Sequence, residues 1–109
     1  MTAPSSPPDA PAPEQAARDA LAALMAAPTA GLGLALDGAL ARLTLARPPG
    51  NRFDLALLER LDAVLGVLSQ AADASVVRAV LLIAEGDDFS HGADLRDPAL
   101  GKRIVAGRA

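Results

Sequence analysis

The residues best placed to do chemistry lie in one short segment, residues 89–95, with the sequence Phe-Ser-His-Gly-Ala-Asp-Leu. The segment follows an apolar run over residues 76–83 and a polar link over residues 85–88. This order predicts a buried strand, a turn, and a glycine-bearing bend that opens toward a helix. Backbone N–H groups at such a bend lack internal acceptors, so they can be directed at a negative charge that develops during a reaction.

The side chains of this segment leave several interpretations open. His91 is the only imidazole of the chain, so it is either a general base or a loop histidine without a chemical role; no second residue in the sequence is placed to orient it. Asp94 is either an acid or base, or a carboxylate at a helix start stabilised by free N–H groups. Arg96, Lys102 and Arg103 either meet a phosphate or keep the surface soluble.

Composition excludes several classes of function. The 109 residues suffice for one small domain, and 51% hydrophobic with 21% charged residues is typical of a globular chain. Aromatic residues make up only 2%, with no Trp or Tyr, so stacking platforms for bases are absent. A net charge of −3 also argues against binding a phosphate backbone. We therefore expect no nucleic-acid partner.

The reactive residue types are equally restricted. The chain has no Cys and a single His, which excludes disulfides, a thiolate zinc site and a cysteine nucleophile, and argues against any metal site built on histidines. No apolar run approaches the roughly 18 residues of a membrane span. No basic cluster precedes an apolar stretch near the N-terminus, as a signal peptide requires. We expect no membrane partner and a cytoplasmic location.

The first 29 residues divide into two parts. Residues 1–13 are rich in Ala, Pro and Ser and predict a disordered tail. Residues 14–29 predict an N-terminal helix that stops before Pro28. Its apolar stripe is narrow, so it either docks on the domain, docks on a partner, or frays. Residues 30–109 form the third predicted part of the chain.

This third part predicts an α/β fold. Residues 31–46 alternate as a β-hairpin with an Asp37-Gly38 turn. A helix capped by Asp54 follows to about residue 72, with Leu57, Leu58, Leu61, Val64, Leu65 and Leu68 on one face and Arg60 largely away from it.

The end of the chain predicts two more elements. The nearly continuous apolar run over residues 76–83 predicts a strand covered on both faces, as in a parallel sheet. Strand, helix and strand then form a βαβ unit. The Asp97-Pro98 pair predicts a cap for a final short helix that runs to about residue 105.

Two segments of the sequence resemble one family. Residues 89–95 resemble the Phe-x-x-Gly-Ala-Asp-hydrophobic segment of the enoyl-CoA hydratase/isomerase (crotonase) superfamily. Residues 45–51, Leu-Ala-Arg-Pro-Pro-Gly-Asn, resemble its Leu-Asn-Arg-Pro…Asn segment. Both occur in the right order and are joined by a helix and a strand. The resemblance covers residues 32–97, the N-terminal portion of such a domain.

The resemblance implies a partial ββα spiral, preceded here by the tail and the N-terminal helix. It implies acyl thioesters of coenzyme A as substrates, with no permanently bound cofactor, and lyase or isomerase activity in fatty acid or aromatic acid metabolism. Members usually assemble as trimers or pairs of trimers, so a trimer-type homo-oligomer is implied where the full domain is present.

The resemblance also assigns site residues. It makes the Ala93 backbone N–H one of two donors that hold the thioester oxygen; a small side chain there leaves room for the acyl group. It makes Arg47, His91 and Gly92 contacts of coenzyme A, and it implies no metal.

The chain departs from the family at several points, among them Pro98, which could shorten or kink the final helix. Pro49 stands where many members carry a basic or polar residue, and Arg52-Phe53 replaces the usual Ala-Leu. Members are more than twice as long, and their second oxyanion donor and catalytic carboxylates have no match here, so enzyme activity of this chain stays open. The sequence predicts a CoA-thioester-binding, oxyanion-stabilising portion of such a protein. The alternative is a truncated, non-catalytic remnant that acts in subunit association.

Overall fold

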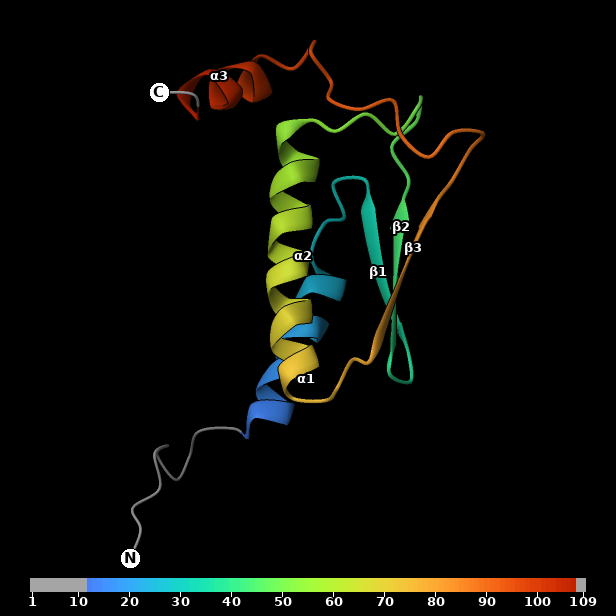
Figure 1. Ribbon diagram of the computed structural model, residues 1–109, viewed down its shortest axis with the longest axis vertical. Helices are drawn as coiled ribbons and strands as arrows, with labels where there is room; N and C mark the ends of the chain where they lie inside the picture. The colour runs from blue at the N-terminus through green and yellow to red at the C-terminus, as the bar shows by residue number, and fades with distance from the viewer. Residues whose placement is uncertain (1–11, 108–109) are drawn as a thin grey trace, which may run out of the picture.

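The computed structural model describes residues 12–107, which form one three-stranded sheet with helices beside it (Figure 1). The elements, in chain order, are α1 (Pro13–Ala26), β1 (Leu32–Asp37), β2 (Leu40–Leu45), α2 (Leu55–Asp73), β3 (Ala79–Ala84) and α3 (Pro98–Ala106). This is the element order that the sequence predicted. The predicted tail lies outside the described residues, apart from residue 12 and Pro13, the first residue of α1. The three-part division of the chain stays a prediction.

The hairpin pairs β1 and β2 antiparallel, from Leu32 opposite Leu45 to Asp37 opposite Leu40. Its two turn residues are therefore Gly38 and Ala39, one position later than the predicted turn. Gly38 has φ +59°, which glycine adopts without steric cost. The register places alternate residues of β2 on one face of the sheet, where Ala41, Leu43 and Leu45 are buried.

The predicted cap of α2 is confirmed. The Asp54 carboxylate accepts a hydrogen bond from the Leu57 N–H at 2.9 Å, which satisfies one of the free donors at the helix start. The predicted buried face is partly wrong, because Leu65 is half exposed and Arg60 is buried. α1 packs beside α2 as well as against β1, and this rotates the buried face toward α1.

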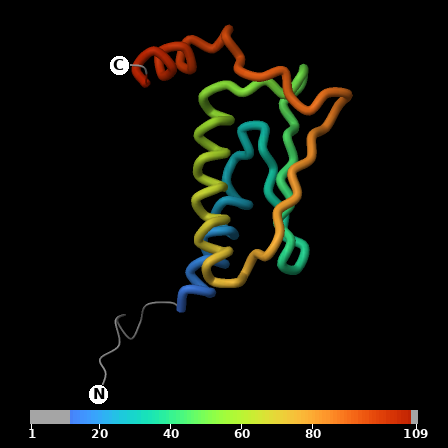
Figure 2. Tube along the Cα trace, viewed as in Figure 1, coloured from blue at the N-terminus to red at the C-terminus, as the bar shows by residue number. Residues whose placement is uncertain are grey.

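Arg60 of α2 connects this helix to α1 and β1. Its Nε donates to the Leu32 carbonyl at 3.2 Å, and one terminal nitrogen donates to the Leu24 carbonyl at 2.8 Å. Ala17 and Leu21 of α1 are buried in the same apolar cluster as the inward residues of the sheet. α1 therefore docks on the domain, and Figure 2 shows its trace running beside α2.

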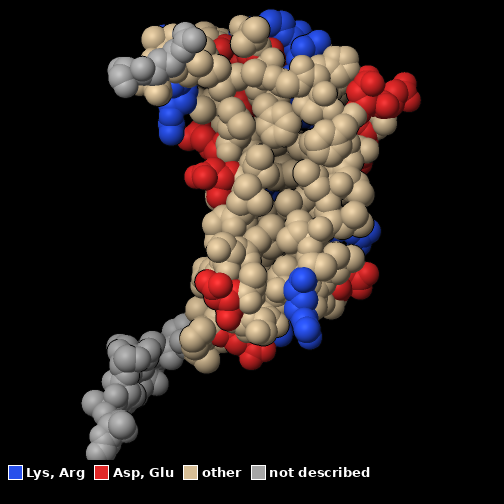
Figure 3. Space-filling model, viewed as in Figure 1, with Lys and Arg blue, Asp and Glu red and all other residues tan. Residues whose placement is uncertain are grey.

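β3 is the exposed part of the sheet. It pairs parallel with β2, with Leu82 opposite Leu43, so β2, α2 and β3 form the predicted βαβ unit. The prediction that this strand is covered on both faces is wrong: Val80, Leu81, Leu82 and Ile83 are 39–49% exposed. β3 is an edge strand, and α1 and α2 pack over β1 instead. In Figure 3 the middle of the visible face is uncharged, while charged side chains gather toward its ends.

None of the helices within residues 12–107 combines the length and the apolar character that crossing a membrane requires.

Candidate functional site

Two loops meet at one end of the sheet. The first, residues 46–54, follows β2, and the second, residues 85–97, follows β3. Because β2 and β3 are parallel neighbours, their carboxyl ends lie at the same edge and deliver both loops there (Figure 1). We call the contact between these two loops the loop junction. It contains all four predicted site residues.

Backbone hydrogen bonds hold the loop junction together. The His91 N–H donates to the Gly50 carbonyl, the Phe53 N–H to the Gly92 carbonyl, and the Asp94 N–H to the Phe53 carbonyl, each at 2.8 Å. The last two bonds form a parallel bridge between Phe53 and Ala93. Short, aligned bonds on both sides of Ala93 fix the direction of its peptide groups.

Ala93 has the geometry of a free backbone donor. In a parallel bridge, the residue whose two neighbours make the bonds points its own N–H and C=O away from the partner segment. Ala93 is exposed, and its N–H donates to no acceptor within the part of the chain that the structure describes. The N–H is therefore held in direction, belongs to an exposed residue, and has no partner among the described residues.

Gly92 sets up this arrangement. Its φ of +90° lies in a region that glycine adopts readily and other residues rarely do. Its N–H donates to the Ser90 hydroxyl at 3.0 Å, and its carbonyl accepts from Phe53. Both polar backbone groups of Gly92 are thus bonded, unlike the N–H of the next residue.

Arg47 turns its guanidinium into the protein. The group donates to the Arg52 carbonyl at 2.7 Å and to Asp94 at 3.1 Å, and it lies 3.3 Å from Asp54. Its side chain is mostly buried. In this structure Arg47 braces the loop junction from within, and its role as a contact of coenzyme A stays a prediction.

Asp94 is the buried carboxylate of the site. It accepts hydrogen bonds from the side chains of Arg96 and Arg47 and from the Arg96 N–H. The hydrogen bonds from the Arg96 side chain, followed by those from the Arg96 backbone and from Arg47, hold the pKa of Asp94 well below its usual range, although burial opposes this. The same contact raises the pKa of Arg96. Asp94 therefore stays ionised and ties the two loops together.

Asp94 does not stand at a helix start, so that interpretation of the sequence is wrong. The helix-start carboxylate belongs to Asp97, which accepts from the Ala99 N–H at 3.0 Å. The other oxygen of Asp97 accepts from the Leu55 N–H at 2.9 Å. One side chain thus caps α3, as predicted, and also binds the first residue of α2.

His91 has partners that the sequence did not reveal. Its Nε2 lies 2.9 Å from an Asp88 carboxylate oxygen, and its Nδ1 lies 3.4 Å from a terminal nitrogen of Arg52. Because arginine can only donate, Nδ1 accepts and Nε2 carries the proton toward Asp88. Both ring nitrogens therefore have a polar partner, and the choice between a general base and a loop histidine without a chemical role stays a prediction.

Asn51 lies at the centre of the loop junction and is only 2% exposed. Its side-chain nitrogen is within hydrogen-bond distance of three carbonyl oxygens of the second loop. In the sequence, Asn51 stood out only as the last residue of the family-like segment 45–51. The Gly-Asn order indicates a turn, but no local pattern indicates acceptors more than thirty positions away.

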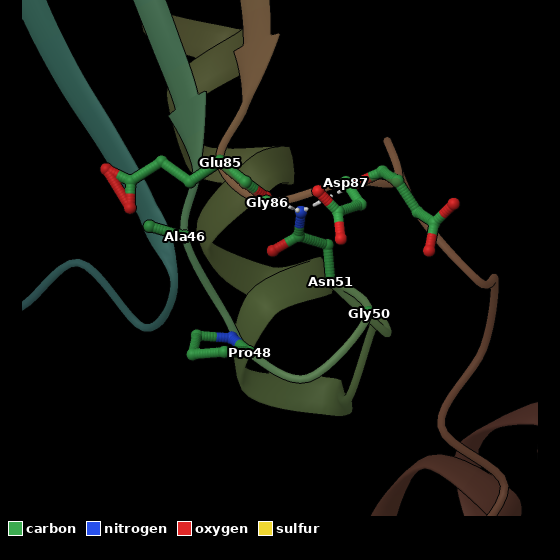
Figure 4. A pocket seen from close by; sticks show the side chains of 8 residues that line it. Ala46, Pro48, Gly50, Asn51, Glu85, Gly86 and Asp87 are labelled. Carbon is green, nitrogen blue, oxygen red and sulfur yellow. Dashed lines mark hydrogen bonds between the residues drawn. The ribbon is translucent and has the colours of Figure 1, made fainter.

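Two hollows flank these residues. A cavity of about 340 Å³ is bordered by Pro48 and Asn51 on one side and by residues 85–88 on the other (Figure 4). Three of those four residues are acidic, so this cavity disfavours phosphate groups, and Ala93 does not line it. A hollow of about 220 Å³ is lined in part by Arg52 and His91, which places a cation beside a predicted contact of coenzyme A.

Within residues 12–107, no group of three or more His, Asp or Glu side chains is arranged to hold a metal ion.

Comparison with known proteins gives consistent similarities. No family model matches the chain. A curated protein, the cyclohexa-1,5-dienecarbonyl-CoA hydratase of Thauera aromatica, is 48% identical over 59 residues, which is 54% of this chain and 22% of that protein. The chain thus spans about a fifth of this relative.

Solved structures share the fold. A putative enoyl-CoA hydratase from Thermobifida fusca YX in complex with CoA matches with a TM-score of 0.57 and 30% identity, over 79% of this chain and 35% of that chain. A putative enoyl-CoA hydratase from the same organism in complex with acetoacetyl-CoA matches with a TM-score of 0.53 and 35% identity, over 72% and 27%. These similarities confirm the predicted family resemblance and the predicted fold class.

Proposed function

We propose that this chain, which corresponds to the N-terminal portion of the enoyl-CoA hydratase/isomerase (crotonase) superfamily, binds an acyl thioester of coenzyme A and stabilises negative charge on its carbonyl oxygen. The donor is the Ala93 backbone N–H. The thioester is a substrate, and the proposal includes no permanently bound cofactor.

One observation carries this proposal: Ala93 is an exposed residue whose N–H has no acceptor among the described residues, and hydrogen bonds on both sides of it hold its direction. A mobile amide would have to reorient toward the negative charge as it develops, whereas a fixed donor needs no reorganisation. One such donor typically contributes about 3–4 kcal/mol of transition-state stabilisation. Related structures hold CoA or acetoacetyl-CoA, which supports this class of ligand.

The predicted contacts of coenzyme A remain part of the proposal. His91 and Gly92 lie directly before Ala93, so a thioester that reaches Ala93 passes beside them. The guanidinium of the partly exposed Arg52, 3.4 Å from the His91 ring, offers a positive charge for a phosphate. The Arg47 guanidinium is bonded internally, so its proposed contribution is to hold the loops.

The proposal covers binding and oxyanion stabilisation. No residue of this chain is matched to the catalytic carboxylates of the family, and general acids and bases contribute about 10²–10⁴-fold to such reactions. A complete lyase or isomerase reaction therefore needs an acid or base for which no residue of this chain has been identified. We place the protein in the cytoplasm as part of the same proposal.

A second candidate function is subunit association without catalysis. The exposed apolar side chains of β3 favour it, because an uncovered edge strand presents free backbone groups for pairing with another chain. The partner in this second function would be another copy of the chain, and such association is compatible with ligand binding.

The test is thermal unfolding of the full chain with acetoacetyl-CoA and with CoA. A ligand that binds only the folded state raises its stability, by about 2.7 kcal/mol at a hundred times Kd. We expect both ligands to stabilise the chain, and acetoacetyl-CoA more, because only the thioester carbonyl reaches Ala93. An unchanged unfolding temperature with both ligands would contradict the proposal and leave association as the better candidate.

A further inference from the structure

Asn51 is the buried side chain of the loop junction whose hydrogen bonds all go to backbone groups. Its Nδ2 donates to the carbonyls of Glu85, Asp88 and Phe89 at 2.9, 3.3 and 3.1 Å, and its Oδ1 accepts from the Arg47 N–H at 2.9 Å. A primary amide has two N–H donors, so two of the three carbonyls share one N–H. The opposite orientation of the amide would set an oxygen against three carbonyls, which excludes it.

The backbone of Asn51 requires an unusual residue as well. Its φ of +50° lies in the left-handed region, where Asn and Gly are the residues found most readily. Its N–H donates to the Arg47 carbonyl at 3.0 Å. Glycine would satisfy this backbone but has no amide, and most other residues with a donor would strain it. Asn meets both requirements.

A short series of bonds connects Asn51 to the proposed donor. The Asn51 carbonyl accepts from the Ser90 hydroxyl at 2.7 Å, and the same hydroxyl oxygen accepts from the Gly92 N–H at 3.0 Å. The Asn51 side chain meanwhile holds residues 85–89 against the first loop. The segment that leads into Ala93 is therefore positioned by Asn51 through its side chain and through its backbone.

We propose that Asn51 is a positioning residue, which fixes the direction of the Ala93 N–H without touching the ligand. This inference rests on the proposed function for its chemical meaning. Its structural content, that Asn51 determines the geometry around Ala93, can be measured without any ligand. The two parts can therefore fail separately.

The first experiment compares amide hydrogen exchange in the wild type and in Asn51→Gly, which keeps the backbone conformation and removes the amide. Three N–H groups report on the loop junction, those of Phe53, His91 and Asp94. We expect each to exchange at least about tenfold faster, because three carbonyls lose a buried donor. Amides of β2 should change by less than about threefold, because none of the lost bonds lies in the sheet.

The matched control is Arg60→Met, which also removes a buried polar side chain bonded to distant carbonyls. It acts where α2 meets α1 and the start of β1, and Arg60 makes none of the hydrogen bonds of the loop junction. We expect faster exchange in α1 and β1 and unchanged exchange at His91 and Asp94. Equal acceleration of all amides in Asn51→Gly would overturn the inference, because Asn51 would then stabilise the whole fold. No acceleration at the loop junction would overturn it too, because Asn51 would then not order the loops.

Ser90→Ala decides the question if Asn51→Gly does not fold. It removes only the link between the Asn51 carbonyl and the Gly92 N–H. The inference predicts at least about fivefold faster exchange at Gly92 with unchanged exchange in β2. Unchanged exchange at Gly92 would overturn it.

Ligand binding by the same variants distinguishes the proposed function from the positioning role of Asn51. In both loop variants we expect the preference for acetoacetyl-CoA over CoA to fall while the affinity for CoA itself changes little. If the wild type binds neither ligand, the proposed function is wrong, and the exchange pattern still decides the positioning role. If the exchange pattern is as expected and the acyl preference is unchanged, Asn51 orders the loops without orienting the donor, and the inference is wrong.

Discussion

The loop junction and the strand β3 belong to the same sheet and are stabilised in opposite ways. In the loop junction, a buried Asn, a buried Asp and several backbone groups are paired at 2.7–3.3 Å. In β3, four consecutive apolar side chains are half exposed, and no neighbouring strand covers the outer edge within the described residues. The site is therefore ordered by its own polar bonds, whereas β3 depends on burial that this chain supplies only in part.

Mutations in the loop junction and mutations in the sheet should therefore have different consequences. Polar bonds fix conformation locally, and losing one disturbs its neighbours more than the distant core. Apolar burial stabilises in proportion to the area removed from water. Changes in the loop junction should alter geometry and ligand selectivity, and changes in the sheet should alter stability or association.

The largest expected effect comes from two leucines that are register partners on the neighbouring strands β2 and β3. Leu43 in β2 is 2% exposed, and its register partner Leu82 in β3 is 43% exposed. Leu43→Ala should cost about 2–5 kcal/mol, because it leaves a cavity in the core. Leu82→Ala should cost about 1 kcal/mol. Urea unfolding of both variants at low protein concentration measures the difference, and equal costs would show that β3 is covered in solution.

The sequence could predict the elements whose causes are local. The caps at Asp54 and Asp97, the hairpin and the long helix each depend on neighbouring residues and were found close to their observed bounds. The exposure of β3 could not be predicted, because an apolar run looks the same whether or not another element covers it. The burial of Arg60 was missed because its acceptors lie in α1 and β1.

The candidate site was predictable only in part for the same reason. A resemblance pointed to Ala93, although alanine has no reactive side chain. The structure adds what the spacing could not contain: Asn51 reaches carbonyls 34 to 38 positions away, and Asp94 pairs with Arg47 across 47 positions. The Asp88–His91 contact spans only three positions, so this partner of the imidazole was missed although it is local.

A second prediction concerns the acid stability of the loop junction. The pKa of Asp94 is lowered in the folded state, chiefly by hydrogen bonds from Arg96, so folding favours its ionised form. Its contribution to stability is complete above the unfolded-state pKa of about 3.9 and declines as the pH falls below that value. Asp94→Asn should therefore be less stable at neutral pH and should lose less stability on acidification.

Unfolding free energies measured from pH 7 down to about pH 2 check this prediction. The wild-type and Asp94→Asn curves should converge as the pH falls. Curves that stay parallel through this range would mean that the ion pairs of Asp94 contribute nothing to folding, and that the loop junction rests on its backbone bonds and Asn51 alone.

A third prediction concerns the open edge. Leu82→Lys places a charge on β3, and charged residues on edge strands prevent pairing between chains. Leu65→Lys is the matched control, since Leu65 is equally apolar and 50% exposed, but on α2. Sedimentation velocity over a series of concentrations should show association reduced by Leu82→Lys and little changed by Leu65→Lys. The reverse order would assign the contact to the helix face.

If the backbone N–H of Ala93 recognises the thioester oxygen, two substitutions at this one position should have different effects on binding. Ala93→Gly keeps the donor, whereas Ala93→Pro removes it and breaks no internal hydrogen bond among the described residues. Calorimetric titration of both variants with acetoacetyl-CoA and with CoA separates the acyl contribution from the rest of the ligand. We expect Ala93→Pro to weaken only acetoacetyl-CoA binding, by roughly 0.5–1.5 kcal/mol, or about two- to twelvefold in Kd, and Ala93→Gly to retain it. A folded Ala93→Pro variant with undiminished preference for acetoacetyl-CoA would contradict the claim.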